Sequence, residues 1–201
     1  DPAGGLGILA RELGTLQAAG IKFDLHFIGH SAGAILLGEL LDILPGHGLT
    51  CSSMRLFAPA CTVEFAHTHY LDTSAGAPSL KPKKFHIHIV DDAQERADTS
   101  GPYNKSLLYL ICRALEEEHK TPVLGMDAVW NGIYDKKDIF ESDMLDEHVK
   151  PWRKAMKNAG ITPDVWDKAK LVDDGLEKKE PTHGGFDNDR HLLTAAIKSI
   201  L

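Results

Sequence analysis

A serine flanked by glycines, in Gly29-His30-Ser31-Ala32-Gly33, is the part of the sequence best suited to covalent chemistry. A serine hydroxyl becomes a strong nucleophile when an adjacent base removes its proton. A Gly-x-Ser-x-Gly string presents such a serine on a sharp turn from a strand to a helix. Side chains two residues before or after the serine are expected to clash there, and the helix dipole favours the developing negative charge. We therefore predict that Ser31 is a nucleophile.

The residues around this string have the pattern that such a turn requires. An apolar run over 23–28 predicts a strand. The strongly apolar stretch from Ala32 to Leu44 predicts a buried helix that ends at Pro45-Gly46. Further strands are predicted over 54–58, 85–90 and 122–126, and further helices over 2–19, 102–118 and 189–200, the last with Asp187 or Asn188 as its N-cap. The alternation predicts an α/β fold with a mostly parallel sheet flanked by helices, in one domain over 1–201.

The serine string between strand and helix resembles the α/β-hydrolase superfamily of serine hydrolases, which includes esterases and lipases. The resemblance covers about 2–126 and 181–201. In this family the chain order is serine, acid, histidine, and the histidine lies in a loop before the last helix. The resemblance therefore implies that His183 is the base, because Gly184 and Gly185 allow its loop to fold sharply. His191 is less suited, since it is expected within the helix.

The resemblance also implies that the acid lies in the loop after the strand at 85–90. Asp98 is favoured, because Pro102 follows it by four residues and can begin a helix. Asp91 and Asp92, at the end of the strand, are alternatives that could instead cap backbone amides. Asp127 is a further alternative.

The expected reaction is acyl transfer without a cofactor. His183 would take the proton of Ser31, the oxygen would attack an ester carbonyl, and water would hydrolyse the acyl-enzyme. The backbone N–H of Ala32 is expected to donate to the oxyanion. Residues predicted to line the acyl pocket are His30, His67, His69 and Tyr70.

Two features depart from the family. Only one predicted helix precedes the strand that leads to Ser31, whereas the family has several strands there, including one that supplies the second oxyanion donor. We therefore expect the chain to be the C-terminal portion of a longer hydrolase. The segment 127–180 is charged, weakly patterned and contains all three tryptophans. It is expected to be a variable insertion, with one further strand at 168–172.

Composition favours a small-molecule partner, and the resemblance implies that this partner is an ester. A net charge of −7 offers no basic surface for nucleic acid or anionic membranes. No apolar stretch approaches the roughly 20 residues of a membrane span. Three scattered cysteines (Cys51, Cys61 and Cys112) predict buried thiols and a reducing, cytoplasmic location.

Two His-x-His pairs, His67/His69 and His86/His88, invite a metal interpretation, but no third or fourth ligand has suitable spacing, so no metal is expected.

Two other functions stay open. One is a non-catalytic binding protein on a hydrolase scaffold. The other is an acyltransferase or thioesterase that uses the same three side chains.

Overall fold

A sheet of four parallel strands forms the centre of the protein in a computed structural model. The model describes residues 4–71, 76–78, 80–166 and 182–200, except the side chains of 187, 188, 191 and 192. The strands are β1 (Leu25–His30), β2 (Cys51–Phe57), β3 (Phe85–Val90) and β4 (Asp164–Trp166), and they lie side by side in chain order. The α/β class and the parallel sheet are confirmed.

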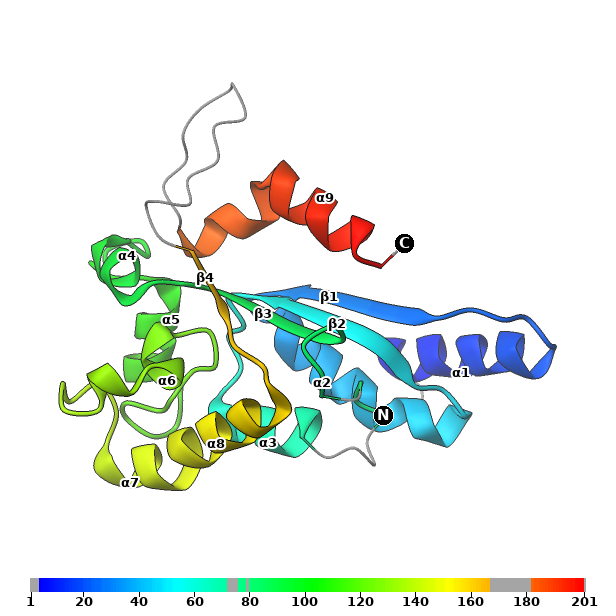
Figure 1. Ribbon diagram of the computed structural model, residues 1–201, viewed down its shortest axis with the longest axis horizontal. Coiled ribbons are helices and arrows are strands. Elements are labelled where there is room, and N and C mark those ends of the chain that lie inside the picture. Colours follow the sequence, from blue (N-terminus) through cyan, green and yellow to red (C-terminus); the bar gives the residue numbers. More distant parts are fainter. Residues whose placement is uncertain (1–3, 72–75, 79, 167–181, 201) are drawn as a thin grey trace.

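Helices cover both faces of the sheet (Figure 1). Helix α9 (Arg190–Lys198) lies over one face, and α1 (Gly5–Ala18), α2 (Gly33–Ile43), α3 (Val63–Tyr70) and α8 (Lys150–Ala159) lie over the other. The predicted strand at 85–90 and the predicted helices at both ends of the chain agree with β3, α1 and α9 to within a few residues.

Shorter helical segments gather beyond the carboxyl ends of the strands, where α4 follows β3 directly (Figure 1). They are α4 (Asp92–Ala97), α5 (Leu107–Leu110), the π-helical η3 (Ile111–Leu115), α6 (Asp127–Trp130), η4 (Gly132–Tyr134), α7 (Ser142–Met144) and the π-helical η5 (Leu145–Val149). The 3₁₀ segments η1 (Leu44–His47) and η7 (His183–Asn188) complete the described helical elements.

The strand predicted over 122–126 does not form, and the segment's pairing with the sheet is limited to one isolated parallel bridge between Met126 and Val90 at the end of β3. Pro122 and Val123 instead contact the loop after β2, where Val123 forms an isolated antiparallel bridge with Thr62. Gly125 donates to the carbonyl of Pro59, and a Cβ on Gly125 would lie 2.7 Å from that oxygen. The segment is therefore held across the end of the sheet, and the fourth strand is β4.

The helix predicted over 102–118 is also shorter than expected. Pro102 lies in a tight turn in which Ser100 and Tyr103 exchange two backbone hydrogen bonds of 2.9 and 3.0 Å. The helical stretch begins only at Leu107, because the hydroxyl of Ser106 accepts a hydrogen bond from the Tyr109 N–H and caps it.

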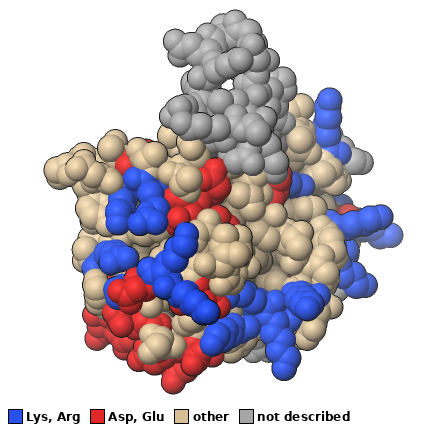
Figure 2. Space-filling model, turned by 60° about the vertical axis from the view of Figure 1, so that its left-hand side comes forward, with Lys and Arg blue, Asp and Glu red and all other residues tan. Residues whose placement is uncertain are grey.

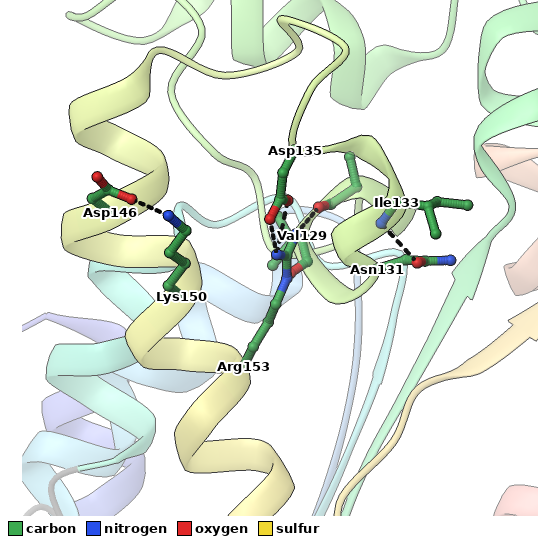
Figure 3. A network of polar contacts seen from close by, with 8 residues as sticks. Val129, Asn131, Ile133, Asp135, Asp146, Lys150 and Arg153 are labelled. Atoms are coloured by element: carbon green, nitrogen blue, oxygen red, sulfur yellow. Dashed lines mark hydrogen bonds and ion pairs between the residues drawn. The ribbon is translucent and has the colours of Figure 1, made fainter.

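The segment beyond 126 packs closely against the rest of the molecule up to β4. Trp152 on α8 is fully buried. Arg153 binds the carbonyls of Ala128 and Val129 at 2.7 Å each and the carboxylate of Asp135 at 2.8 Å, which fixes α6 against α8 (Figure 3). The strand predicted at 168–172 lies outside the described residues, as do the side chains of Asp187 and Asn188 that were predicted to cap the last helix.

The surface of the protein mixes both signs of charge on the face drawn in Figure 2. No described helix is both long enough and apolar enough to cross a lipid bilayer. All three cysteines are buried and unbridged, as predicted.

Candidate active site

Ser31 occupies the sharp turn between β1 and α2. Its φ of +53° lies in the left-handed region, which costs a non-glycine residue free energy and persists only where the surroundings enforce it. The enforcement comes from the last residue of β2 and from the loop that follows it. The Ser31 N–H donates to the Phe57 carbonyl at 3.0 Å, and the Ser31 carbonyl accepts from the Ala60 N–H at 3.0 Å.

The two glycines of the string have different surroundings. A Cβ on Gly29 would lie 2.7 Å from Leu37 Cδ1, at the end of a flexible side chain, and 3.3 Å from the backbone of Gly33, so a side chain there would require Leu37 to shift. A Cβ on Gly33 would meet nothing within 4 Å among the described residues. The predicted clash therefore exists at the first glycine only.

His183 lies against the serine. Its Nε2 is 2.8 Å from Ser31 Oγ, although 152 residues separate the two in the chain. The histidine is only 7% exposed, and its Nδ1 atom is buried. This geometry suits transfer of the hydroxyl proton to Nε2.

Two aromatic side chains hold the loop that carries His183. His30, next to the serine, donates from Nε2 to the His183 carbonyl at 2.8 Å. Phe186 is buried, with its ring centroid 5.7 Å from that of Phe57 and 5.9 Å from that of Trp166. Sequence reasoning placed His30 in a pocket wall and missed this contact, because nothing in the sequence pairs residues so far apart.

Asp98 contacts the same segment through the backbone of His183. Its Oδ2 accepts a hydrogen bond from the His183 backbone N–H at 3.3 Å, and its Oδ1 accepts from the Thr99 N–H at 2.8 Å. Asp98 directly follows the last turn of α4, and its own N–H donates to Gln94. The structure therefore brings Ser31, His183 and Asp98 together from loops after β1, β4 and β3.

The alternative acids contact other groups. Asp91 caps α4 by accepting from the Gln94 N–H at 2.9 Å. Asp92 is buried and accepts from the Tyr109 hydroxyl at 2.5 Å. Asp127 accepts from the Asp92 N–H and the Tyr134 hydroxyl, and burial raises its pKa. Within the described chain none of these three carboxylates is hydrogen-bonded to His183.

The backbone N–H of Ala32 is available to a ligand. Ala32 is exposed, and within the described part of the chain its N–H has no hydrogen-bond acceptor. It follows Ser31 immediately, at the start of α2, where backbone N–H groups stabilise negative charge.

Three residues predicted to line an acyl pocket have packing roles on α3. The Tyr70 hydroxyl is buried and donates to the Ala34 carbonyl at 2.5 Å. His69 contacts the Asp42 carboxylate at 2.8 Å, and His67 Nε2 donates to the His148 carbonyl at 3.1 Å. These contacts join α3 to α2 and η5, and none of them involves Ser31.

The second histidine pair lies in the sheet. His88 stacks on Phe57, and its Nε2 is 2.7 Å from Arg55 Nη1. Burial and the neighbouring Arg55 lower the pKa of His88 to about 4, so its ring is neutral at physiological pH. Among the described residues no three His, Cys, Asp or Glu side chains are arranged to hold a metal ion.

Comparison with known proteins gives no relative. No protein-family model matches the sequence, and neither a curated protein nor a solved structure is detectably similar to it. The site is therefore interpreted from its own geometry.

Proposed function

We propose that the protein is a serine hydrolase that cleaves carboxylic esters through Ser31, His183 and Asp98. The observation that carries the proposal is the 2.8 Å contact between Ser31 Oγ and His183 Nε2 at a serine with a φ of +53°. Left-handed backbone by itself is not specific, since Ala58, Lys120 and Asp138 also adopt it. At Ser31 it is combined with the histidine contact, as expected for a nucleophile that projects toward its base.

The order of the elements supports an α/β-hydrolase type of fold. The serine follows β1, Asp98 follows β3 and His183 follows β4, and the three strands belong to one parallel sheet. Loops at the carboxyl ends of parallel strands meet at one edge, so three distant segments can form one site.

The proposed reaction has two halves. His183 Nε2 takes the Ser31 proton while Oγ bonds to the ester carbonyl, and the Ala32 N–H donates to the oxyanion. The alcohol leaves with the proton from His183. Water, deprotonated by the same nitrogen, then attacks the acyl-serine and releases the carboxylic acid, which restores the free hydroxyl.

Asp98 would act through the histidine. A carboxylate beside the loop favours the imidazolium that forms when the proton moves, and its bond to the His183 N–H fixes the loop. Asp91 caps α4, and Asp92 and Asp127 accept hydrogen bonds from tyrosine hydroxyls. These contacts favour Asp98 over the other three acids.

The test is turnover of p-nitrophenyl butyrate by the wild-type protein and by Ser31→Ala. The proposal predicts release of p-nitrophenolate that Ser31→Ala lowers by about 10⁴-fold or more. Ser53→Ala, which removes a half-buried serine on β2, is the matched control and should retain turnover. Equal turnover by the wild type and Ser31→Ala would overturn the proposal.

A further inference from the structure

The loop that carries Asp98 is closed at its base by two hydrogen bonds between the same two residues. The Ser106 N–H donates to the Glu95 carbonyl at 2.8 Å, and the Ser106 hydroxyl donates to Glu95 Oε2 at 2.8 Å. Ser106 is fully buried and also caps α5. Both ends of the segment 95–106 are therefore fixed at one point.

Asp98 lies inside this closed loop. Its N–H is bound to the Gln94 carbonyl at 2.9 Å, and the turn between Ser100 and Tyr103 closes the far end. Because the loop is short and held at both ends, a shift of Glu95 relative to Ser106 moves the Asp98 carboxylate relative to His183.

Glu95 is an unusual side chain to find at the base of the loop. It is 1% exposed, and no donor among the described residues contacts its Oε1. The carboxylates of Asp92, Asp98 and Asp127 act on it, and all three oppose a negative charge there. The nearby cation Arg96 is 3.7 Å from Asp92 and half exposed.

An ionised carboxylate is therefore costly at this position. Burial away from water, with smaller contributions from the three acids, raises the pKa of Glu95 from 4.5 to about 8. The neutral acid accepts the Ser106 hydrogen bond without placing a charge in the core. An ionised Glu95 would still accept from Ser106, but it would be drawn toward water and repelled by the three nearby carboxylates, which would shift it.

We propose that Glu95, as a buried neutral carboxylic acid, is a positioning residue that holds Asp98 beside His183, and that its ionisation disables the site. The inference rests on the proposed function, because it assigns to Glu95 a role that acts through Asp98. It makes the site sensitive to alkaline pH through a residue that touches neither substrate nor Ser31.

The first experiment compares kcat for p-nitrophenyl butyrate between pH 6 and 10 in the wild type, Glu95→Gln and Glu117→Gln. Glutamine keeps an acceptor for Ser106 and cannot ionise. Glu117 is exposed and is the matched control. The proposal predicts that wild-type kcat falls above about pH 8 by up to about tenfold per pH unit, the limit for one ionisation. Above about pH 8, Glu117→Gln should follow the wild type, and Glu95→Gln should stay flat. Identical profiles in Glu95→Gln and the wild type would overturn it.

A third variant separates protonation from packing. Glu95→Leu fills the site but offers Ser106 no acceptor, so kcat should be low at every pH while Glu95→Gln stays active. If Glu95→Leu equals Glu95→Gln in kcat, the hydrogen bond to Ser106 does not position Asp98 and the proposal fails.

The second experiment needs no activity. A group whose pKa is raised in the folded state makes the protein less stable as pH rises from the unfolded value, 4.5, to the folded value, about 8. Urea unfolding should therefore show a loss of wild-type stability over this interval that Glu95→Gln lacks. Parallel curves would show that Glu95 is not a buried neutral acid. Absence of esterase activity at every pH, with divergent unfolding curves, would instead refute the proposed function and the role in positioning, and leave only the neutral acid.

Discussion

The two halves of the site are built in different ways. The serine turn is formed by residues that are contiguous in the chain, from β1 through Ser31 to α2. Two backbone hydrogen bonds, to Phe57 and from Ala60, hold the serine in place. The acid follows α4 and the base begins η7, and a hydrogen bond of 3.3 Å from the His183 N–H to the Asp98 carboxylate joins them. The position of Ser31 thus depends on backbone contacts, whereas the positions of His183 and Asp98 depend on side-chain contacts and, in our proposal, on the buried Glu95. We expect the second half to be the more easily disturbed.

The largest effect should come from removing the base. His183→Ala deletes the group 2.8 Å from Ser31 Oγ, so kcat for p-nitrophenyl butyrate should fall by about 10⁴-fold or more while the turn stays folded. The control is His119→Ala, whose side chain is 59% exposed and lies 3.6 Å from the carboxylate of Glu141. Turnover within about tenfold of the wild type in His183→Ala would contradict the assignment of the base.

A smaller loss should follow removal of the acid, and it distinguishes Asp98 from Asp127. Asp98→Asn should lower kcat by about 10²–10⁴-fold with little change in stability. Asp127→Ala should do the opposite, because it removes the acceptor for the Asp92 N–H and the Tyr134 hydroxyl, with a loss of about 1–3 kcal/mol in the free energy of unfolding. Steady-state kinetics and urea unfolding of both variants decide the matter. The reverse pattern would make Asp127 the acid.

The smallest effects concern the two glycines and test how tightly the serine turn is built. Gly29→Ala places a methyl group 2.7 Å from Leu37 Cδ1 and should cost about 1–2 kcal/mol. Gly33→Ala meets open space in the first turn of α2, where alanine is the better helix former, and should stabilise by up to about 1 kcal/mol. Thermal unfolding measures both. A destabilising Gly33→Ala would show that both glycines are needed for packing.

The contrast also explains what the sequence could predict. The strand, serine and helix at 25–43 follow from one local pattern, because the apolar run, the glycines and the helical stretch are adjacent. The missing strand at 122–126 and the shortened helix after Pro102 depend on contacts with Pro59 and on a turn between Ser100 and Tyr103. Such contacts leave no periodic signal.

The residues of the candidate site were predicted in part, and the long-range contacts that hold them were not. The resemblance to a family suggested His183 and Asp98, and the structure brings both to Ser31, while their roles stay predictions. The contact of His30 with the His183 carbonyl and the bonds between Glu95 and Ser106 were not predicted. A buried acid and a surface acid look alike in a sequence, because burial depends on the whole fold.

The most direct test is covalent labelling with a fluorophosphonate, an electrophile that reacts fastest with a serine activated as a nucleophile. The account predicts one adduct per chain, located by peptide mass spectrometry on Ser31, absent in Ser31→Ala and formed much more slowly in His183→Ala. A folded protein that stays unlabelled, or that carries the adduct on another residue, would contradict it.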